Sequence, residues 1–173
     1  MKKVATLGEI LMRLATPNKE RILQAKNFDA DYGGGEYNVA VSLSQFGVPT
    51  KFITALPDNA VGDAALYRIR GFGIDTTSIL RQGDRLGLYF LEHGAAMRAS
   101  KVVYDRAKSS ISDIKTNTVD WQKAFSDIDW FHFTGITPAL SKSAAEVTLE
   151  AAKAAKEMGI TVSADMNYRK NLW

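Results

Sequence analysis

The sequence of 173 residues contains no cysteine, only two histidines and no long apolar run. Without cysteine there are no disulfide bonds and no thiolate metal sites, and His93 and His132 are too few for a histidine-rich metal site. Charged residues or glycine interrupt every apolar stretch well short of the roughly 20 residues that span a bilayer. Met1-Lys2-Lys3 leads into "VATLGEILM" and not into a leader with a small-residue cleavage site. We therefore expect a soluble, cytoplasmic protein.

The charged residues do not form the blocks that nucleic-acid-binding segments carry. Lysine and arginine number 22 against 19 acidic residues, for a net charge of +3, and they are scattered among the acids. We expect no nucleic-acid partner, although a modest positive charge helps to attract anionic small molecules. With 46% hydrophobic residues, the chain has the composition of an ordinary globular core and is one domain or part of one.

Strand and helix patterns alternate along most of the chain. "KFITAL" reads as a buried strand, and Gly47 followed by Pro49 is the expected end of the helix before it. Alternation of strand, helix and strand predicts right-handed crossovers and a parallel sheet. The expected strands are 3–15 (in two extended pieces), 51–56, 129–136 and 160–167; the expected helices are 38–47, 59–73 and 141–159, the last capped by Ser141 or Ser143.

The section from Thr76 to Tyr104 differs from its surroundings because it is polar and rich in β-forming residues. "RLGLYFLEHG" and "MRASKVVYDR" read as short strands, and no helix in this section could cover a sheet face. We predict an accessory β flap inserted into an α/β sheet.

Three glycines, Gly33 to Gly35, stand directly before an apolar helix that we expect to begin near Asn38. Either they let a ligand approach the unpaired N–H groups of the helix start, or they form a plain loop that needs positive φ angles. A phosphate-binding P-loop is excluded because no lysine follows them, and a dinucleotide fingerprint is excluded because Asn38 occupies its third glycine position.

The pattern G-G-x-x-x-N-x-A, from Gly33 to Ala40, together with "PDNAVGDAALYRIRGFGID", resembles the N-terminal signature of the ribokinase-like (PfkB) sugar kinases. Departures are Glu36, where the common form has Gly, Ala or Pro, and Pro57, where it has glycine. The resemblance runs over the whole chain. It implies a three-layer α/β/α fold with a small β-sheet lid, whose N-terminal half is one domain over residues 1–173. The lid segments are expected near 10–30 and 84–107.

The G-G-x-E-x-N form, "GLYFLE", "VVYDR", "FTGITPALS" and "SADMNYRKNLW" are similar to the 2-keto-3-deoxygluconate kinase branch of that family. The resemblance implies that arginines grip the carboxylate of a sugar acid, that tyrosines of the lid close over it, and that the glycine turn holds the sugar and not the nucleotide. Each of these residues also has a structural alternative, such as packing within a sheet or, for Asn38, a helix cap. The implied substrate-binding residues are Gly34, Asn38, Tyr89, Tyr104, Arg106, Ile136 and Arg169.

Phosphoryl transfer requires a base, an anion hole and a nucleotide with Mg²⁺. In the family a late D-x-x-G-A-G-D segment supplies the base and the anion hole, and this sequence contains no such segment. We expect the catalytic aspartate beyond Trp173, ATP and Mg²⁺ as cofactors of the complete enzyme, no metal site in this chain, and no turnover by this chain alone.

Three functions stay open at this stage. The first is the substrate-binding half of a 2-keto-3-deoxygluconate kinase, which would associate with further copies through the lid. The second is a fructokinase or another PfkB-family sugar kinase, in which the arginines would not meet a carboxylate. The third is a non-catalytic sugar-binding or assembly module.

Overall fold

The computed structural model of the protein describes residues 2–173 and contains a main sheet and a smaller second sheet. All strands of the main sheet are parallel, in the order β5–β4–β1–β8–β9. These strands are β1 (Val4–Leu7), β4 (Thr50–Leu56), β5 (Ile79–Arg81), β8 (Trp130–Thr134) and β9 (Thr161–Asp165).

The strand order reverses direction at β1. From β1 the chain moves outward to β4 and β5 on one side, and β8 and β9 then continue on the other side of β1. In open parallel sheets, ligands bind beyond the carboxyl ends of the strands at such a reversal. The ends of β1 and β8 therefore mark the place where a site is expected.

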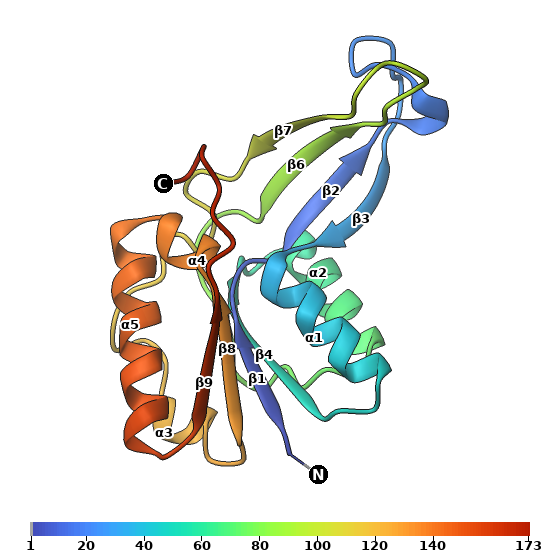
Figure 1. Cartoon of the computed structure of the whole chain (residues 1–173). Helices are drawn as coiled ribbons and strands as arrows, with labels where there is room; N and C mark the ends of the chain where they lie inside the picture. Colours follow the sequence, from blue (N-terminus) through green and yellow to red (C-terminus); the bar gives the residue numbers. More distant parts are fainter. Residues whose placement is uncertain (1) are drawn as a thin grey trace.

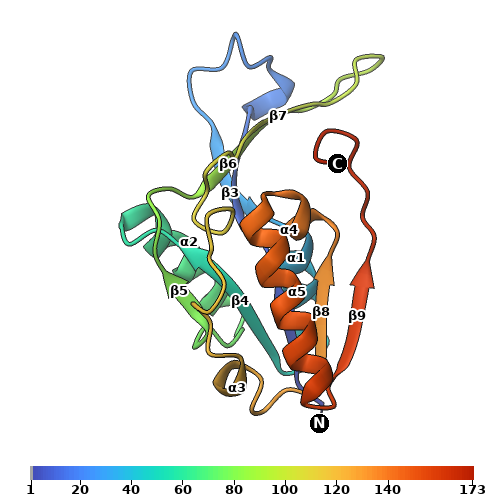
Figure 2. The same cartoon turned by 90° about the vertical axis from the view of Figure 1, so that its left-hand side faces the viewer.

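Helices cover both faces of the main sheet, which gives three layers (Figures 1 and 2). The helices α1 (Gly35–Gln45) and α2 (Ala60–Gly71) pack on one face, and α3 (Trp121–Ala124) and α5 (Lys142–Glu157) on the other. One turn, α4 (Ile136–Ala139), follows β8, and a 3₁₀ turn, η1 (Pro17–Lys19), follows β2. The Ser141 side chain caps α5 by accepting a hydrogen bond from Ala144 N at 3.0 Å.

Successive side chains of β4 point to opposite faces of the main sheet and contribute to both halves of the core. All seven of its residues are buried. Phe52 and Leu56 belong to the cluster beneath α1 and α2, whereas Ile53 and Ala55 belong to the cluster beneath α3 and α5.

The second sheet, called the lid sheet below, rises from the main sheet at one end (Figure 1). Its order is β3–β2–β6–β7, with β2 and β6 parallel and both outer pairs antiparallel. The N-terminus lies at the opposite end of the main sheet, and the C-terminal segment runs up beside the lid sheet (Figures 1 and 2). The strands are β2 (Leu11–Ala15), β3 (Asp29–Gly33), β6 (Gly87–Glu92) and β7 (Lys101–Asp105).

The predicted α/β/α fold with a small β lid is confirmed, and one local prediction is wrong. The first helix begins at Gly35 and not near Asn38, because the glycines themselves adopt the end of β3 and the start of the helix. The two strands predicted for the flap do form part of the lid sheet, as β6 and β7, whereas the patterns did not indicate β5, which pairs with β4 in the main sheet. The sequence patterns also did not indicate β3, α3 and α4.

Candidate functional site

The predicted site residues lie on three parts of the molecule at the lid end of the main sheet. Gly34 and Asn38 belong to the start of α1, Ile136 is the first residue of α4, and the loop after β9 carries Arg169. The remaining residues, Tyr89, Tyr104 and Arg106, lie on the lid sheet or directly after it. The carboxyl ends of the main-sheet strands thus face the base of the lid sheet (Figure 1).

The glycine turn is a place of close packing and not of unusual backbone angles. Gly34 is extended (φ 172°) and stands at the N-cap of α1, where a Cβ atom would overlap the backbone carbonyl of Glu9. A Cβ atom on Gly33 would lie 3.1 Å from the Tyr89 hydroxyl. None of Gly33 to Gly35 lies in the left-handed region, so the alternative of a loop that needs positive φ is wrong.

The buried carboxylate of Glu36 fixes the start of α1 at the strand reversal. Its Oε1 accepts hydrogen bonds from Thr134 N at 3.0 Å, Thr134 Oγ1 at 2.8 Å and Thr137 Oγ1 at 2.8 Å. Its side chain also fills the space that a Cβ atom on Gly8 would need. Glu36 therefore joins the glycine turn to the end of β1 and to the turn between β8 and α4.

A row of paired residues crosses one face of the lid sheet, with one residue on each strand. Asp31 on β3 is opposite Arg13 on β2, Arg13 is opposite Tyr89 on β6, and Tyr89 is opposite Tyr104 on β7. Residues directly paired across strands share a face. The ring centroids of Tyr89 and Tyr104 are 5.7 Å apart. Burial raises the pKa of Tyr89, and the neighbouring charge of Arg13 opposes that rise.

Arg106 continues this row below the lid sheet. Its guanidinium carbon lies 5.4 Å from the centroid of the Tyr104 ring, within the range of a cation–π contact. The structure thus brings together three of the residues predicted from sequence, Tyr89, Tyr104 and Arg106. Arg106 is not free, because its Nη2 donates to the carboxylate of Glu9.

Glu9, which the sequence reasoning missed, is the charged residue in the short connection between β1 and β2. Its side chain is 2% exposed, and its Oε1 accepts a hydrogen bond from Ser109 Oγ at 2.6 Å. Burial raises the pKa of Glu9, while the charge of Arg106 and the hydrogen bond from Ser109 act against the rise. A single acid within the apolar run "LGEILM" was the available sign of a buried, paired carboxylate.

The start of α4 and the loop after β9 close the other side of the glycine turn. A Cβ atom on Gly35 would be 3.7 Å from Ile136 Cδ1 and 3.6 Å from Asn167 Nδ2. The main-chain N–H of Ile136 donates to Thr134 Oγ1 at 3.1 Å, so a main-chain contact from Ile136 to a ligand would use its carbonyl. Arg169 is exposed, and its side chain makes no ion pair or hydrogen bond with other residues in 2–173.

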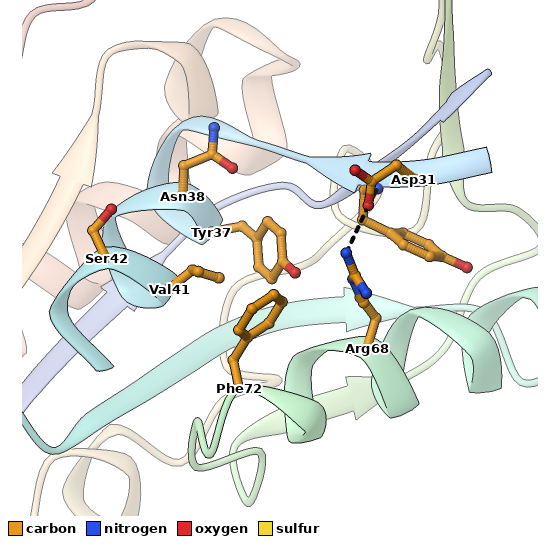
Figure 3. Close-up of a pocket in the computed structure, with 8 residues that line it drawn as sticks. Asp31, Tyr37, Asn38, Val41, Ser42, Arg68 and Phe72 are labelled. Atoms are coloured by element: carbon orange, nitrogen blue, oxygen red, sulfur yellow. Dashed lines mark hydrogen bonds and ion pairs between the residues drawn. The ribbon is translucent and has the colours of Figure 1, made fainter. Parts of the chain in front are cut away.

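Asn38 is exposed and lies in the first turn of α1, where its N–H bonds to the carbonyl of Gly34. Gly34 occupies the cap position, so the alternative of a capping role for Asn38 is wrong. Asn38 borders a hollow between β3, α1 and α2, and its amide points away from the side where Tyr37 faces Arg68 (Figure 3). The other six predicted residues do not line this hollow.

Asp31 ties the lid sheet to α2 at the edge of the same hollow. It accepts from Arg13 at 2.9 Å within the lid sheet and from Arg68 of α2 at 3.0 Å (Figure 3). Because all three side chains are partly exposed, we assign these pairs an orienting role and little stability.

The described residues do not fit an Mg²⁺ site. No group of three or more His, Cys, Asp or Glu side chains in residues 2–173 could hold a metal ion. Glu9 and Glu36, the two buried acids of the site, are each occupied by protein hydrogen bonds.

Comparisons with known proteins connect this arrangement to one family. The family model for the pfkB family carbohydrate kinases matches residues 1–173. The chain belongs to this family. This agrees with the sequence resemblance and with the lid sheet beside the glycine turn.

Individual relatives are similar over the full length of this chain. A 2-dehydro-3-deoxygalactonokinase of Haloferax volcanii is 34% identical over 99% of this chain and 54% of the relative. A 2-dehydro-3-deoxygluconokinase of Thermoproteus tenax is 29% identical over 100% of this chain and 52% of the relative. The crystal structure of 2-dehydro-3-deoxygluconokinase from Thermotoga maritima is 51% identical, covers 100% of this chain and 53% of its own, and has a TM-score of 0.97.

The chain spans about half the length of the curated relatives it matches. None of the helices within residues 2–173 combines the length and the apolar character that crossing a membrane requires.

Proposed function

We propose that this chain is the sugar-acid-binding part of a cytoplasmic, ATP-dependent kinase that phosphorylates 2-keto-3-deoxygluconate, which is the same compound as 2-dehydro-3-deoxygluconate. The observation that carries the proposal is the contact series Tyr89, Tyr104 and Arg106 on the lid sheet, next to the glycine turn. The names of the relatives support the same class of substrate, a 2-keto-3-deoxy sugar acid.

The chemistry of the side chains suits such a ligand. A sugar acid offers a carboxylate, a keto oxygen and hydroxyl groups. The planar guanidinium groups of Arg106 and Arg169 can each donate two parallel hydrogen bonds to a carboxylate. Tyr89 and Tyr104 offer an apolar ring face and a hydroxyl to the sugar. Gly34, Asn38 and Ile136 would complete the sugar-facing wall at the start of α1 and α4.

ATP supplies the phosphoryl group in this proposal, and Mg²⁺ would accompany it as in other phosphoryl transfers. The described residues contribute neither a metal-binding cluster nor a glycine-rich phosphate cradle. Their part is to bind and orient the sugar acid under the lid sheet. We propose that the base and the nucleotide site belong to sequence outside these residues.

The open side of the main sheet supports a further covering segment. In residues 2–173, β9 pairs with β8 on one side only. Trp130 on β8 is 39% exposed, and Tyr168 and Trp173 beyond β9 are 66% and 61% exposed. Large aromatic side chains usually gain by burial, so a second part of the kinase would stabilise this face.

The exposed strand β7 supports association through the lid sheet. All of its residues are exposed, and it pairs only with β6 in the described part of the chain. Val102 and Val103 are 44% and 43% exposed. We propose that a second copy of the chain covers this edge, because free apolar edge strands otherwise favour uncontrolled pairing.

The substrate class is tested with Arg169→Ala in the full product of the gene that encodes this chain. Loss of a bidentate arginine should raise the KM for 2-keto-3-deoxygluconate about tenfold or more and leave the KM for fructose, a neutral sugar, unchanged. Lys170→Ala, at the neighbouring exposed position, is the matched control. Equal weakening of the sugar acid and the neutral sugar would contradict the carboxylate role and favour a fructokinase. The epimer 2-keto-3-deoxygalactonate should be assayed beside 2-keto-3-deoxygluconate.

The alternative of a non-catalytic module is tested at the gene. The proposal predicts that the coding sequence continues past Trp173 and encodes a D-x-x-G-A-G-D segment. A stop codon directly after Trp173 in the natural gene would contradict the kinase proposal and favour a binding or assembly module.

A further inference from the structure

Glu9 is an acidic residue buried where the lid sheet joins the main sheet. It lies in the connection of three residues between β1 and β2. Solvent reaches 2% of its side chain. A carboxylate buried to this degree costs several kcal/mol unless it is paired, and replacing a buried pair by apolar side chains often leaves stability unchanged or improved. A contribution to stability therefore does not explain an acid at this position.

Glu9 lies near the base of every strand of the lid sheet. It stands two residues before β2, and its backbone carbonyl lies against Gly34, which follows β3. At the start of β6, a Cβ atom on Gly87 would lie 2.8 Å from Glu9 Oε1 and 3.3 Å from Arg106 Cβ. Arg106 itself directly follows β7. The carboxylate thus occupies the joint through which the lid sheet meets the rest of the molecule.

The carboxylate is also in direct contact with the Arg106 guanidinium. Nη2 of Arg106 donates to Glu9, and the face of the guanidinium rests on the Tyr104 ring. Nε of Arg106 is buried without a hydrogen-bond partner among residues 2–173. A guanidinium has five N–H donors in one plane, so fixing one edge and one face orients all the others. A free arginine would instead lose its rotamer freedom when it binds a ligand.

Resting on the function proposed above, we propose that Glu9 is a positioning residue, which holds Arg106 in the orientation that receives the carboxylate of the sugar acid. Glu9 acts through Arg106 and does not itself contact the sugar. Two like charges would repel each other, so the sugar carboxylate has to meet the guanidinium on donors that Glu9 leaves free.

The test compares Glu9→Gln, Glu9→Ala and Arg106→Ala, and each Glu9 change combined with Arg106→Ala, in the full gene product. Glu9→Ala should raise the KM for 2-keto-3-deoxygluconate about tenfold, the scale of one charge-assisted hydrogen bond, with kcat and the KM for ATP unchanged. Glu9→Gln retains an oxygen that can accept from Arg106 but loses the charge, so its KM should rise less, by about threefold. In the Arg106→Ala background, the Glu9→Ala change should have no further effect on this KM.

Glu150→Gln is the control for a hydrogen-bonded carboxylate remote from the lid sheet. Glu150 on α5 accepts from Trp121 Nε1 at 2.8 Å, next to α3 at the end of the main sheet away from the lid (Figure 1). The midpoint of urea unfolding, measured for every variant, reports structural damage separately. If Glu9→Ala does not fold, Glu9→Gln tests the positioning role instead. The proposal then predicts that Glu9→Gln raises the KM for the sugar acid about threefold or more when Arg106 is present, and has no effect on this KM in the Arg106→Ala background.

Unchanged KM values in all Glu9 variants, or an equal effect of Glu9→Ala with and without Arg106, would overturn the positioning role alone. A wild-type protein that neither binds nor phosphorylates the sugar acid would overturn the proposed function and this role with it. The two failures are therefore distinguishable from the wild-type measurement.

Discussion

Replacing Glu36 by alanine should remove the connection between the glycine turn and the end of β8. One carboxylate oxygen accepts three hydrogen bonds, from Thr134 N, Thr134 Oγ1 and Thr137 Oγ1. The threonine hydroxyls can rotate toward other acceptors, but the buried N–H of Thr134 cannot. A buried donor without a partner costs about 1–3 kcal/mol.

The expected loss for Glu36→Ala follows from these contacts. The orphaned N–H, the weakened hydroxyl bonds and the space left against Gly8 together should lower the free energy of unfolding by roughly 3–5 kcal/mol. This is a large share of the roughly 5–15 kcal/mol that a domain usually has. Glu36→Gln retains one accepting oxygen and should cost only about 1–2 kcal/mol.

Urea unfolding followed by tryptophan fluorescence measures these differences. The control is Glu146→Ala on α5. The Glu146 side chain is 52% exposed, and its ion pair with Lys142 is long, with 3.9 Å between Oε1 and Nζ. The expected change is therefore below about 0.5 kcal/mol. A cost for Glu36→Ala no larger than that of the control would refute the reasoning that this carboxylate holds the site together.

Two further predictions concern close packing and pH. Gly34→Ala should destabilise the protein by about 1–3 kcal/mol, because the new Cβ atom would overlap a backbone carbonyl. Gly71→Ala at the end of α2 should stabilise it by about 0.5 kcal/mol, because the new Cβ atom would meet no other atom within 4 Å. Equal thermal midpoints of the two variants would contradict this prediction. Burial acts to raise the pKa of Asp75, but hydrogen bonds from Lys3 and Thr77 lower it from 3.8 to about 2. A lowered acid pKa adds stability above the unfolded value, so the advantage of wild type over Asp75→Asn should be about 1 kcal/mol at neutral pH after solvent screening. That advantage should disappear between about pH 4 and pH 2, and an equal advantage at pH 7 and pH 2 would count against it.

Elements with strong local patterns could be predicted from the sequence. The apolar run of β4 and the helix between Ser141 and Gly159 appear where they were expected. The patterns failed where tertiary pairing decides: β3 is half-exposed and forms against β2, and β5 has three residues that become a strand by pairing with β4. One-turn helices such as α4 are too short for a helical period to show.

The candidate site was predictable residue by residue only in part. The lid residues Tyr89, Tyr104 and Arg106 do come into contact. Glu9 could not be paired with Arg106 from the sequence, because 97 positions separate them and a lone acid does not indicate its partner. The sequence also did not show that Gly34 makes room for the carbonyl of Glu9, and its contact with the sugar stays a prediction.

ATP-dependent phosphorylation of 2-keto-3-deoxygluconate tests the central claim most directly. The assay compares the full product of the gene with the chain of 173 residues, each with ATP, Mg²⁺ and either the sugar acid or fructose. The account predicts phosphorylation of the sugar acid in preference to fructose by the full product, and no turnover by the chain of 173 residues alone. Turnover by that chain, or a full product that phosphorylates fructose and not the sugar acid, would contradict it.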